Sequence, residues 1–435
     1  MTPFSAIFVP QNLRDAVSDR AWLQGMLDAE AALARACAAV GRVPDETAAR
    51  IVDACRTELY DADELARAGR AVGNPAEPLV RALRDAVGGE AADGVHLGAT
   101  SQDVVDTAAM LVARRASSLV LAELDRLAGG CAELAREHRS TPMAARTLLQ
   151  QAVPTTFGLK SAGWLVSVLE GKRRLAAVRD ERLAAQLGGA AGTLAALGDD
   201  GLEVARRYAE ELELAEPILP WHANRQRVAE LGAALDGAAG AAANVGLDVA
   251  LLAQTEVGEV AEASSGGSST MPQKRNPVSS ALAVACARLA HAHASVLLAG
   301  LPHEHERAVG SWHAEWEALS GALSFAGGAA AAAADALTGL EVDAERMRAN
   351  LDTGGGLVVA ERISFALAPS LGRREAHDVV AEAARAPSFR DALLADVRTG
   401  LAADQLDSLL DPLGYLGAAE TLVDRALREY EDATG

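Results

Sequence analysis

Five long helical segments constrain this chain more than any other feature of its sequence. Their residues favour helix over many consecutive turns, at positions 102–137, 155–187, 226–260, 277–300 and 311–340. Half of all residues are apolar, but only 3% are aromatic, so most of the apolar residues are aliphatic. Alanine and leucine supply most of these aliphatic residues, and they allow helices to pack closely. Strand-forming residues gather into no convincing run of hairpins. The sequence therefore predicts an all-α fold with a long central helix bundle.

Shorter helical segments precede this bundle. Through Ser18–Val40 the apolar residues recur at alternating spacings of three and four, which indicates one apolar helix face. Ser18 is a suitable N-cap for this helix, and Gly41 is a suitable stop. Further helices are expected over 45–70 and 76–88, followed by a loop that glycines punctuate.

The helical pattern changes at two points along the chain. Short helices give way to long ones after residue 101, and Gly354–Gly356 precedes a region of shorter helical patterns that prolines interrupt. The length of the chain also favours about three domains. We predict an N-terminal helical domain, a central long-helix bundle domain and a C-terminal helical domain, over residues 1–101, 102–353 and 354–435.

Charge, cysteines and apolar runs exclude several classes of protein. The net charge of −20 leaves no basic face for a nucleic acid, although a local pocket can still be cationic. The four cysteines are widely spaced and form no CxxC pair, which favours free thiols in a reducing compartment. The N-terminus lacks the plan of a signal peptide, and apolar stretches such as Ala329–Ala334 are short. We expect a cytoplasmic protein without a membrane span.

The segment Gly266–Pro277 combines a glycine- and serine-rich stretch with two cations and a proline. Pro277 suits the first turn of a helix, Asn276 is then a natural N-cap, and the free N–H groups of that helix start would favour a bound carboxylate. One interpretation is a flexible linker whose basic residues are solvated. The other is a loop that binds an anionic substrate.

This segment matches every fixed position of the signature G-S-S-x-M-P-x-K-x-N and so resembles the fumarase/aspartase superfamily. The resemblance implies a mobile loop that closes over a carboxylate substrate, with Ser268 as the base that moves a proton next to a carboxylate. A serine needs a cationic, water-excluded setting for that role, and Lys274 is a suitable donor that would also stabilise the aci-carboxylate intermediate. Ser269, Met271 and Asn276 are the expected substrate contacts.

A second block, His96–Asp103, resembles the superfamily segment whose Thr-Ser pair grips a substrate carboxylate. Thr100 and Ser101 fit that role, because hydroxyls and N–H groups near a helix start can cradle a carboxylate. By itself the pair could equally be a helix cap. His96 is a candidate for substrate binding or proton transfer, against the alternative of a structural hydrogen bond.

A third block begins at Ala145 and resembles the G-R-T-H segment of fumarases, argininosuccinate lyases and adenylosuccinate lyases. It supplies Arg146, Thr147 and Gln151 as expected substrate-binding residues. Leu148 stands where those lyases have a histidine for proton chemistry, and leucine can neither donate nor accept a proton. An amine leaving group needs such an acid, whereas a carboxylate leaves without protonation.

The Leu-Leu-Gln-Gln version of this block resembles the 3-carboxy-cis,cis-muconate cycloisomerases, as do Pro220–His222 and the segment from His303 to Trp316. We therefore expect cycloisomerisation of 3-carboxy-cis,cis-muconate to a carboxymuconolactone, in aromatic catabolism and without a cofactor. The alternative is a β-eliminating lyase acting on a succinyl-type substrate, nitrosuccinate or adenylosuccinate. A catalytically silent scaffold is disfavoured by the intact Ser268, Lys274 and Asn276.

Several polar and aromatic side chains in this last segment have more than one interpretation. Arg307 joins Arg146, Lys274 and Arg275 as a candidate contact for a polycarboxylate, although each arginine outside the signature could instead form a structural salt bridge. The spacing of His303 and its neighbours does not suit a metal site, and none is expected. Trp312 and Trp316 favour packing over a substrate platform.

The resemblance also implies a homotetramer with a central bundle of twenty helices and active sites shared between three subunits. Glycines within the segment 226–260 favour the same interpretation, since they weaken a helix unless backbones approach closely there.

Overall fold

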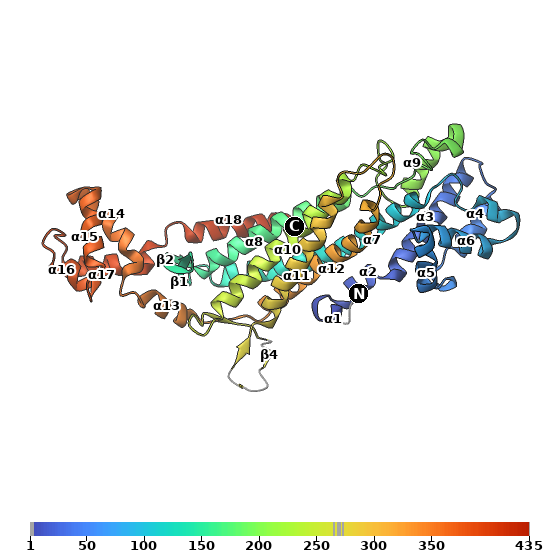
Figure 1. Ribbon diagram of the computed structural model, residues 1–435. Helices are drawn as coiled ribbons and strands as arrows, with labels where there is room; N and C mark the ends of the chain where they lie inside the picture. The colour runs from blue at the N-terminus through green and yellow to red at the C-terminus, as the bar shows by residue number, and fades with distance from the viewer. Residues whose placement is uncertain (1–3, 264–265, 268–270, 272–273, 435) are drawn as a thin grey trace. The chain divides into compact units, whose positions relative to one another are not determined.

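The computed structural model describes residues 4–263, 266–267, 271 and 274–434, and it is dominated by helices (Figure 1). The predicted all-α class is confirmed. The chain forms two compact units, which we call the first and the second unit. The first comprises Met1–Asp125, Glu170–Ala243 and Leu282–Ala332, and the second comprises Arg126–Leu169, Asn244–Ala281 and Ala333–Gly435. The division into three domains stays a prediction.

Each of the five long helices contributes residues to both units. They are α7 (Ser101–Glu137), α8 (Phe157–Glu181), α10 (Gln226–Leu252), α11 (Val278–Ala299) and α12 (Ser311–Leu337). All five predicted segments are helical, but α10 ends eight residues before the predicted residue 260. The chain turns back there, because Gly258 adopts a φ of +63° and the N–H of Glu259 donates to the carbonyl of Leu252 at 2.9 Å.

The first unit also contains further helices, most of which are short. They are α1 (Ser5–Phe8), α2 (Gln11–Ala16), α3 (Asp19–Ala39), α4 (Asp45–Ala54), η1 (Thr57–Leu59), α5 (Ala62–Val72), α6 (Ala76–Val87), η2 (Gly89–Gly94), η3 (Ala195–Asp200) and α9 (Gly201–Glu211). The predicted cap of α3 is confirmed, since the Ser18 side chain accepts from the N–H of Ala21 at 3.2 Å. The single helix predicted over 45–70 is wrong. It divides into α4, η1 and α5 because Asp61 caps a new helix.

The second unit contains the strands and the C-terminal helices. The strands are β1 (Pro142–Thr147), β2 (Gln150–Thr156), β3 (Val260–Ala261), β4 (Gly266–Gly267), β5 (Arg275–Asn276) and β6 (Glu341–Val342). The helices are α13 (Ala344–Asp352), η4 (Leu357–Val359), α14 (Ala360–Leu371), α15 (Arg373–Ala383), α16 (Phe389–Ala395), α17 (Ala403–Leu410), η5 (Pro412–Tyr415) and α18 (Ala419–Thr434). Helices α14 to α17 share a core that includes Ile363, Val379, Phe389 and Leu406.

The hairpin β1–β2 was not expected from the sequence. Its strands pair antiparallel from Pro142 with Thr156 to Thr147 with Gln150. Leu148 and Leu149 form the turn with φ values of +50° and +64°, which a two-residue hairpin turn requires and which asparagine and glycine usually supply. Two leucines at these positions hide the usual sequence signal of a hairpin.

Two of the long helices are strongly apolar. Helices α10 and α11 are long and apolar enough to cross a membrane by length and composition alone. Half of the apolar stretch of α10 is buried within this chain, whereas only 28% of the apolar stretch of α11 is buried.

The four cysteines, Cys37, Cys55, Cys131 and Cys286, are free and buried.

Candidate active site

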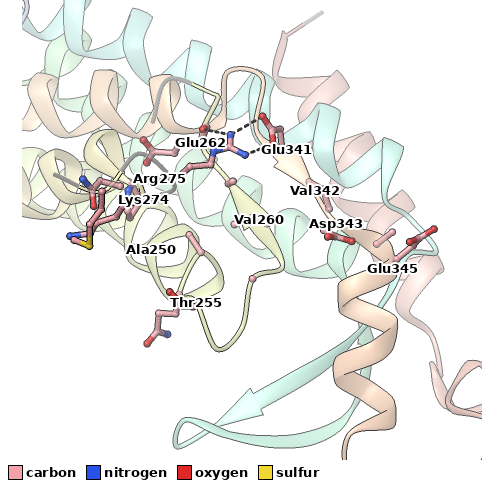
Figure 2. A pocket seen from close by; sticks show the side chains of 18 residues that line it. Ala250, Thr255, Val260, Glu262, Lys274, Arg275, Glu341, Val342, Asp343 and Glu345 are labelled. Carbon is pink, nitrogen blue, oxygen red and sulfur yellow. Dashed lines mark hydrogen bonds and ion pairs between the residues drawn. The ribbon is translucent and has the colours of Figure 1, made fainter. Parts of the chain in front are cut away.

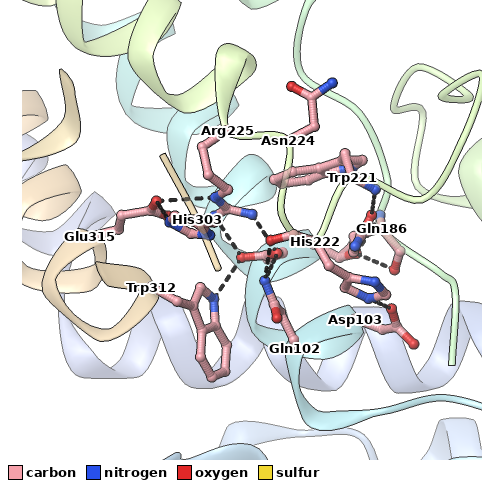
Figure 3. A network of polar contacts seen from close by, with 12 residues as sticks. Gln102, Asp103, Gln186, Trp221, His222, Asn224, Arg225, His303, Trp312 and Glu315 are labelled. Atoms are coloured by element: carbon pink, nitrogen blue, oxygen red, sulfur yellow. Dashed lines mark hydrogen bonds and ion pairs between the residues drawn. The ribbon is translucent and has the colours of Figure 1, made fainter. Parts of the chain in front are cut away.

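In the first unit, Asp103 organises the loop that precedes α7. This buried carboxylate accepts from the N–H groups of Thr100 at 2.9 Å, Gly188 at 3.0 Å and Gly189 at 2.9 Å. Its other contact is Nε2 of His222, at 2.6 Å (Figure 3). The segments around Thr100, Gly188 and His222, which are distant in sequence, are thereby joined by one side chain, which fixes the position of Thr100.

Thr100 and Ser101 lie at the start of α7, where the sequence placed a carboxylate cradle. Both residues are partly exposed, and neither hydroxyl has a hydrogen-bond partner within the described part of the chain. The side chain that caps this helix start is Asp103 rather than Thr100 or Ser101. Both hydroxyls are therefore available to a ligand.

Arg307 reaches the same loops but uses much of its hydrogen-bonding capacity on the protein. Its guanidinium donates to the carbonyls of Gly189 at 2.8 Å, Ala190 at 3.1 Å and Glu306 at 2.8 Å. Burial lowers the pKa of Arg307, which nearby carboxylates partly offset. The side chain supports the loop that Asp103 binds, and a substrate contact would have to use its remaining N–H groups.

A buried ionic network lies beside this loop and was not assigned from sequence. Arg225 donates to both oxygens of Asp106, at 2.8 and 3.0 Å, and also pairs with Glu315 (Figure 3). Trp312 donates from Nε1 to Asp106 at 2.9 Å, and its ring meets that of Trp316 edge to face. Trp312 is thus a structural hydrogen-bond donor, in line with the packing interpretation. Among the described residues, no three potential ligands are placed to hold a metal ion.

His96, also in the first unit, is paired with a buried carboxylate. Its Nδ1 lies 2.6 Å from Oε1 of Glu30 on α3. Burial lowers the pKa of His96, but the charge and hydrogen bond of Glu30 outweigh that effect, so the pKa lies above its ordinary value. Glu30 was not identified from sequence.

In the second unit, a cavity of about 1120 Å³ lies beside the signature segment (Figure 2). Its walls come from the end of α10, from β3 and from the chain around β6, and Met271, Lys274 and Asn276 also line it. Lys274 is exposed, and within the described residues no carboxylate lies at ion-pair distance from its Nζ. Its neighbour Arg275 is paired with Glu341 at 2.6 Å. Lys274 therefore keeps its charge available to an anion in this cavity.

The helix start after the signature differs from the expectation. Helix α11 begins at Val278, and Asn276 belongs to β5. Glu262 occupies the helix start instead, because its carboxylate accepts from the N–H groups of Ser279 at 3.0 Å and Ser280 at 2.8 Å. The N–H groups that we expected to bind a substrate carboxylate therefore bind the internal carboxylate of Glu262 instead.

The hairpin β1–β2 carries Arg146, Thr147 and Gln151. Arg146 pairs with Glu259 through two hydrogen bonds, of 2.9 and 2.6 Å. Asn350 donates to the same carboxylate at 2.7 Å, and Gln151 donates to the carbonyl of Asn350 at 2.9 Å. Thr147 ends β1 and is exposed. The charge of Arg146 is thus balanced by an internal partner.

The structure therefore groups the predicted residues in two sets. His96, Thr100, Ser101 and Arg307 belong to the first unit, whereas Arg146, Thr147, Gln151, Met271, Lys274 and Asn276 belong to the second. Ser268 and Ser269 lie outside the described residues. The functional roles of all these residues stay predictions.

Two family models match the chain, a lyase model over residues 9–290 and a model of the adenylosuccinate lyase C-terminus over residues 356–426. A 3-carboxy-cis,cis-muconate cycloisomerase of Pseudomonas aeruginosa is 49% identical over 98% of this chain and 96% of its own length. A nitrosuccinate lyase of Streptomyces davaonensis is 49% identical over 95% of this chain and 91% of its own. The crystal structure of the 3-carboxy-cis,cis-muconate lactonizing enzyme of Pseudomonas putida matches with a TM-score of 0.93 and 44% identity, over 100% of both chains.

Proposed function

The chain belongs to the fumarase/aspartase superfamily of lyases, and from that premise we propose that it cyclises 3-carboxy-cis,cis-muconate to a carboxymuconolactone. The substrate is a small polycarboxylate, and the reaction, which uses no cofactor, would serve aromatic catabolism through the β-ketoadipate route. The relatives named for this reaction align over nearly all of this chain.

The observation that carries this proposal is Leu148 at the tip of the β1–β2 hairpin. Leu148 is 97% exposed, and it stands where the superfamily block that this segment resembles has a proton-transferring histidine. In the lactonisation, a carboxylate oxygen of the substrate adds to one alkene carbon, and the electron pair of the broken π bond moves to the adjacent carbon and its carboxylate. This aci-carboxylate then takes up one proton at that carbon. The reverse reaction expels a carboxylate, which leaves as a stable anion. Neither direction needs the acid that leucine cannot supply.

Ser268 is the proposed residue that moves the proton to and from carbon. Lys274, with its charge unpaired within the described residues, stabilises the aci-carboxylate. Thr100 and Ser101 bind a carboxylate through their hydroxyls, and His96 acts beside them. Ser269, Met271, Asn276, Arg146, Thr147, Gln151 and Arg307 complete the proposed substrate contacts.

The test is the loss of conjugated-diene absorbance when purified protein is mixed with 3-carboxy-cis,cis-muconate. We expect turnover by the natural chain, none by Ser268→Ala, and unchanged turnover by Ser118→Ala. Ser118 is an exposed hydroxyl on α7 that donates to the carbonyl of Arg114, and so it controls for the loss of a serine. Loss of absorbance in Ser268→Ala would remove Ser268 from the mechanism, and no loss with the natural chain would exclude the substrate.

One observation favours a second candidate, the elimination of nitrite from nitrosuccinate. The Streptomyces davaonensis relative with that name is as similar in sequence as the cycloisomerase. Nitrite also leaves as a stable anion, so Leu148 suits this reaction as well. Release of nitrite from nitrosuccinate without loss of muconate absorbance would favour the lyase.

A homotetramer is part of the same proposal. A Cβ built on Gly237 or Gly240 of α10 would meet no described atom within 4 Å, and most of the apolar stretch of α11 is unburied. Such surfaces suit close packing between helices of neighbouring subunits. The mass in solution, measured by light scattering, should be four times 44.9 kDa.

The buried free thiols support a cytoplasmic location.

A further inference from the structure

Glu30 is a buried acid whose described polar contact is with His96. It lies within α3, is 1% exposed, and holds Nδ1 of His96 at 2.6 Å through Oε1. Its second oxygen, Oε2, is enclosed and has no hydrogen-bond partner within the described residues. A carboxylate removed from water is costly unless a neighbour compensates its charge. The imidazole is the group in position to do so.

His96 is held in an unusual backbone conformation. Its φ is +62°, in the left-handed region that residues other than glycine seldom adopt and that costs on the order of 1–3 kcal/mol. Because Nδ1 faces Glu30, the nitrogen left for a ligand is Nε2. The side chain keeps 14% of its surface exposed, and it lies four residues before Thr100. The imidazole that keeps this free nitrogen thus belongs to the loop that carries the proposed carboxylate cradle.

We propose that Glu30 is a positioning residue that keeps His96 protonated, so that Nε2–H of the imidazolium binds a substrate carboxylate beside Thr100 and Ser101. Nδ1–H stays on Glu30 in this arrangement, and no proton is lost during turnover. The proposal deepens the proposed function and depends on it for the identity of the substrate. The pairing of Glu30 with His96 does not depend on it.

The charged groups around this pair agree with a cationic His96. The carboxylates of Glu30 on α3 and Asp103 on α7 favour the charged ring, while Arg84 on α6 opposes it. The thiols of Cys37 and Cys55 face Glu30 and stay neutral, since burial raises their pKa values to about 11 and about 12. The two carboxylates, Glu30 and Asp103, therefore favour a charged His96 imidazole more than the single cation, Arg84, opposes it.

The test combines histidine ¹³Cε1 NMR with ligand binding on the full-length chain. His96→Gln identifies the His96 signal. We expect that signal to titrate above the ordinary pKa of histidine, and Glu30→Gln to bring its midpoint down. Propane-1,2,3-tricarboxylate, which cannot react, should bind about tenfold more weakly to Glu30→Gln at neutral pH, as expected for losing one charge-assisted hydrogen bond.

Two further variants separate positioning from general damage to the fold. Asp236→Asn removes the acid from the exposed pair that His291 forms at 2.9 Å, and it should leave tricarboxylate binding unchanged. In a His96→Gln background, Glu30→Gln should weaken binding no further, because Glu30 acts through His96.

An unchanged His96 midpoint in Glu30→Gln would overturn the proposal, and so would equal tricarboxylate affinity in the two proteins. If Glu30→Gln does not fold, a His96 midpoint in the natural chain at or below the ordinary pKa of histidine overturns it. None of these measurements requires turnover. Failure of the chain to act on 3-carboxy-cis,cis-muconate would therefore be a separate result.

Discussion

Arg225 in the first unit and Arg275 in the second are both paired with carboxylates, but in opposite surroundings. The side chain of Arg225 is 2% exposed and contacts Asp106 and Glu315, whereas that of Arg275 is 42% exposed and contacts Glu341. A buried pair must stay complete, because one unpaired charge left inside is costly. A pair in water can open at little cost. Arg225 thus holds buried parts of the first unit together, whereas Arg275 of the second unit stays in contact with solvent.

The largest effect should come from breaking the buried network. Arg225→Met leaves Asp106 and Glu315 without their cation, and we expect a loss of about 3–5 kcal/mol in the free energy of unfolding. Urea titration at fixed protein concentration measures it. A loss below about 1 kcal/mol would mean that the network is not structural.

Lys274→Met should reduce activity and leave stability nearly unchanged. We expect kcat/KM to fall by about 10²–10³, because the variant removes a cation next to developing negative charge. The unfolding free energy should change by less than about 0.5 kcal/mol, since Lys274 is exposed. Kinetics and urea titration are compared in one preparation. Arg390→Met is the matched control, because that exposed cation of the second unit is paired with Asp407 and does not line the cavity.

Glu262→Gln tests whether the start of α11 is held by an internal acid. The amide keeps the size of the side chain but accepts less strongly from the N–H groups of Ser279 and Ser280. We expect a loss of about 1 kcal/mol in the unfolding free energy. An unchanged value would show that this helix start does not need the acid.

Arg275→Met should cost far less stability than Arg225→Met, between about 0 and 1 kcal/mol, because both partners of its ion pair are solvated. Glu341→Gln should cost about the same, and raised salt should erase the difference from the natural chain. A cost that persists at high salt would contradict the contrast with Arg225.

The smallest effect concerns pH. Because the folded-state pKa of His96 is raised, its contribution to stability is complete below the ordinary histidine pKa and disappears as pH rises through the folded value. The difference in Tm between the natural chain and His96→Gln should therefore be larger at pH 5.5 than at pH 9. The opposite trend would mean that the ring is neutral in the folded state.

Local patterns in the sequence predicted the five long helices and α3. The apolar face of Ser18–Val40 and its cap at Ser18 follow from spacing and from one side chain. The hairpin was missed because Leu148 and Leu149 are not turn residues, and their φ values depend on the pairing of the strands. A local sequence pattern does not report which strands pair, so it could not predict these φ values.

Contacts between distant residues could not be inferred in the same way. Glu262 caps Ser280 across 18 positions, and Arg225 meets Asp106 across 119, so no local pattern reports either contact. Glu30 is different, because it lies four residues after Met26 and three before Leu33, within the apolar face of its helix. An acid at such a position could have been identified as a candidate for a buried pair.

The burial of the four cysteines has a practical consequence. Burial raises the pKa of Cys37 to about 11 and those of Cys55 and Cys286 to about 12, and it raises that of Cys131 further. At neutral pH almost no thiolate forms, so alkylating reagents and peroxide should react slowly with the folded chain. The rate at which a thiol reagent labels these four cysteines then reports how often each part of the protein opens, and no cysteine has to be introduced for the measurement.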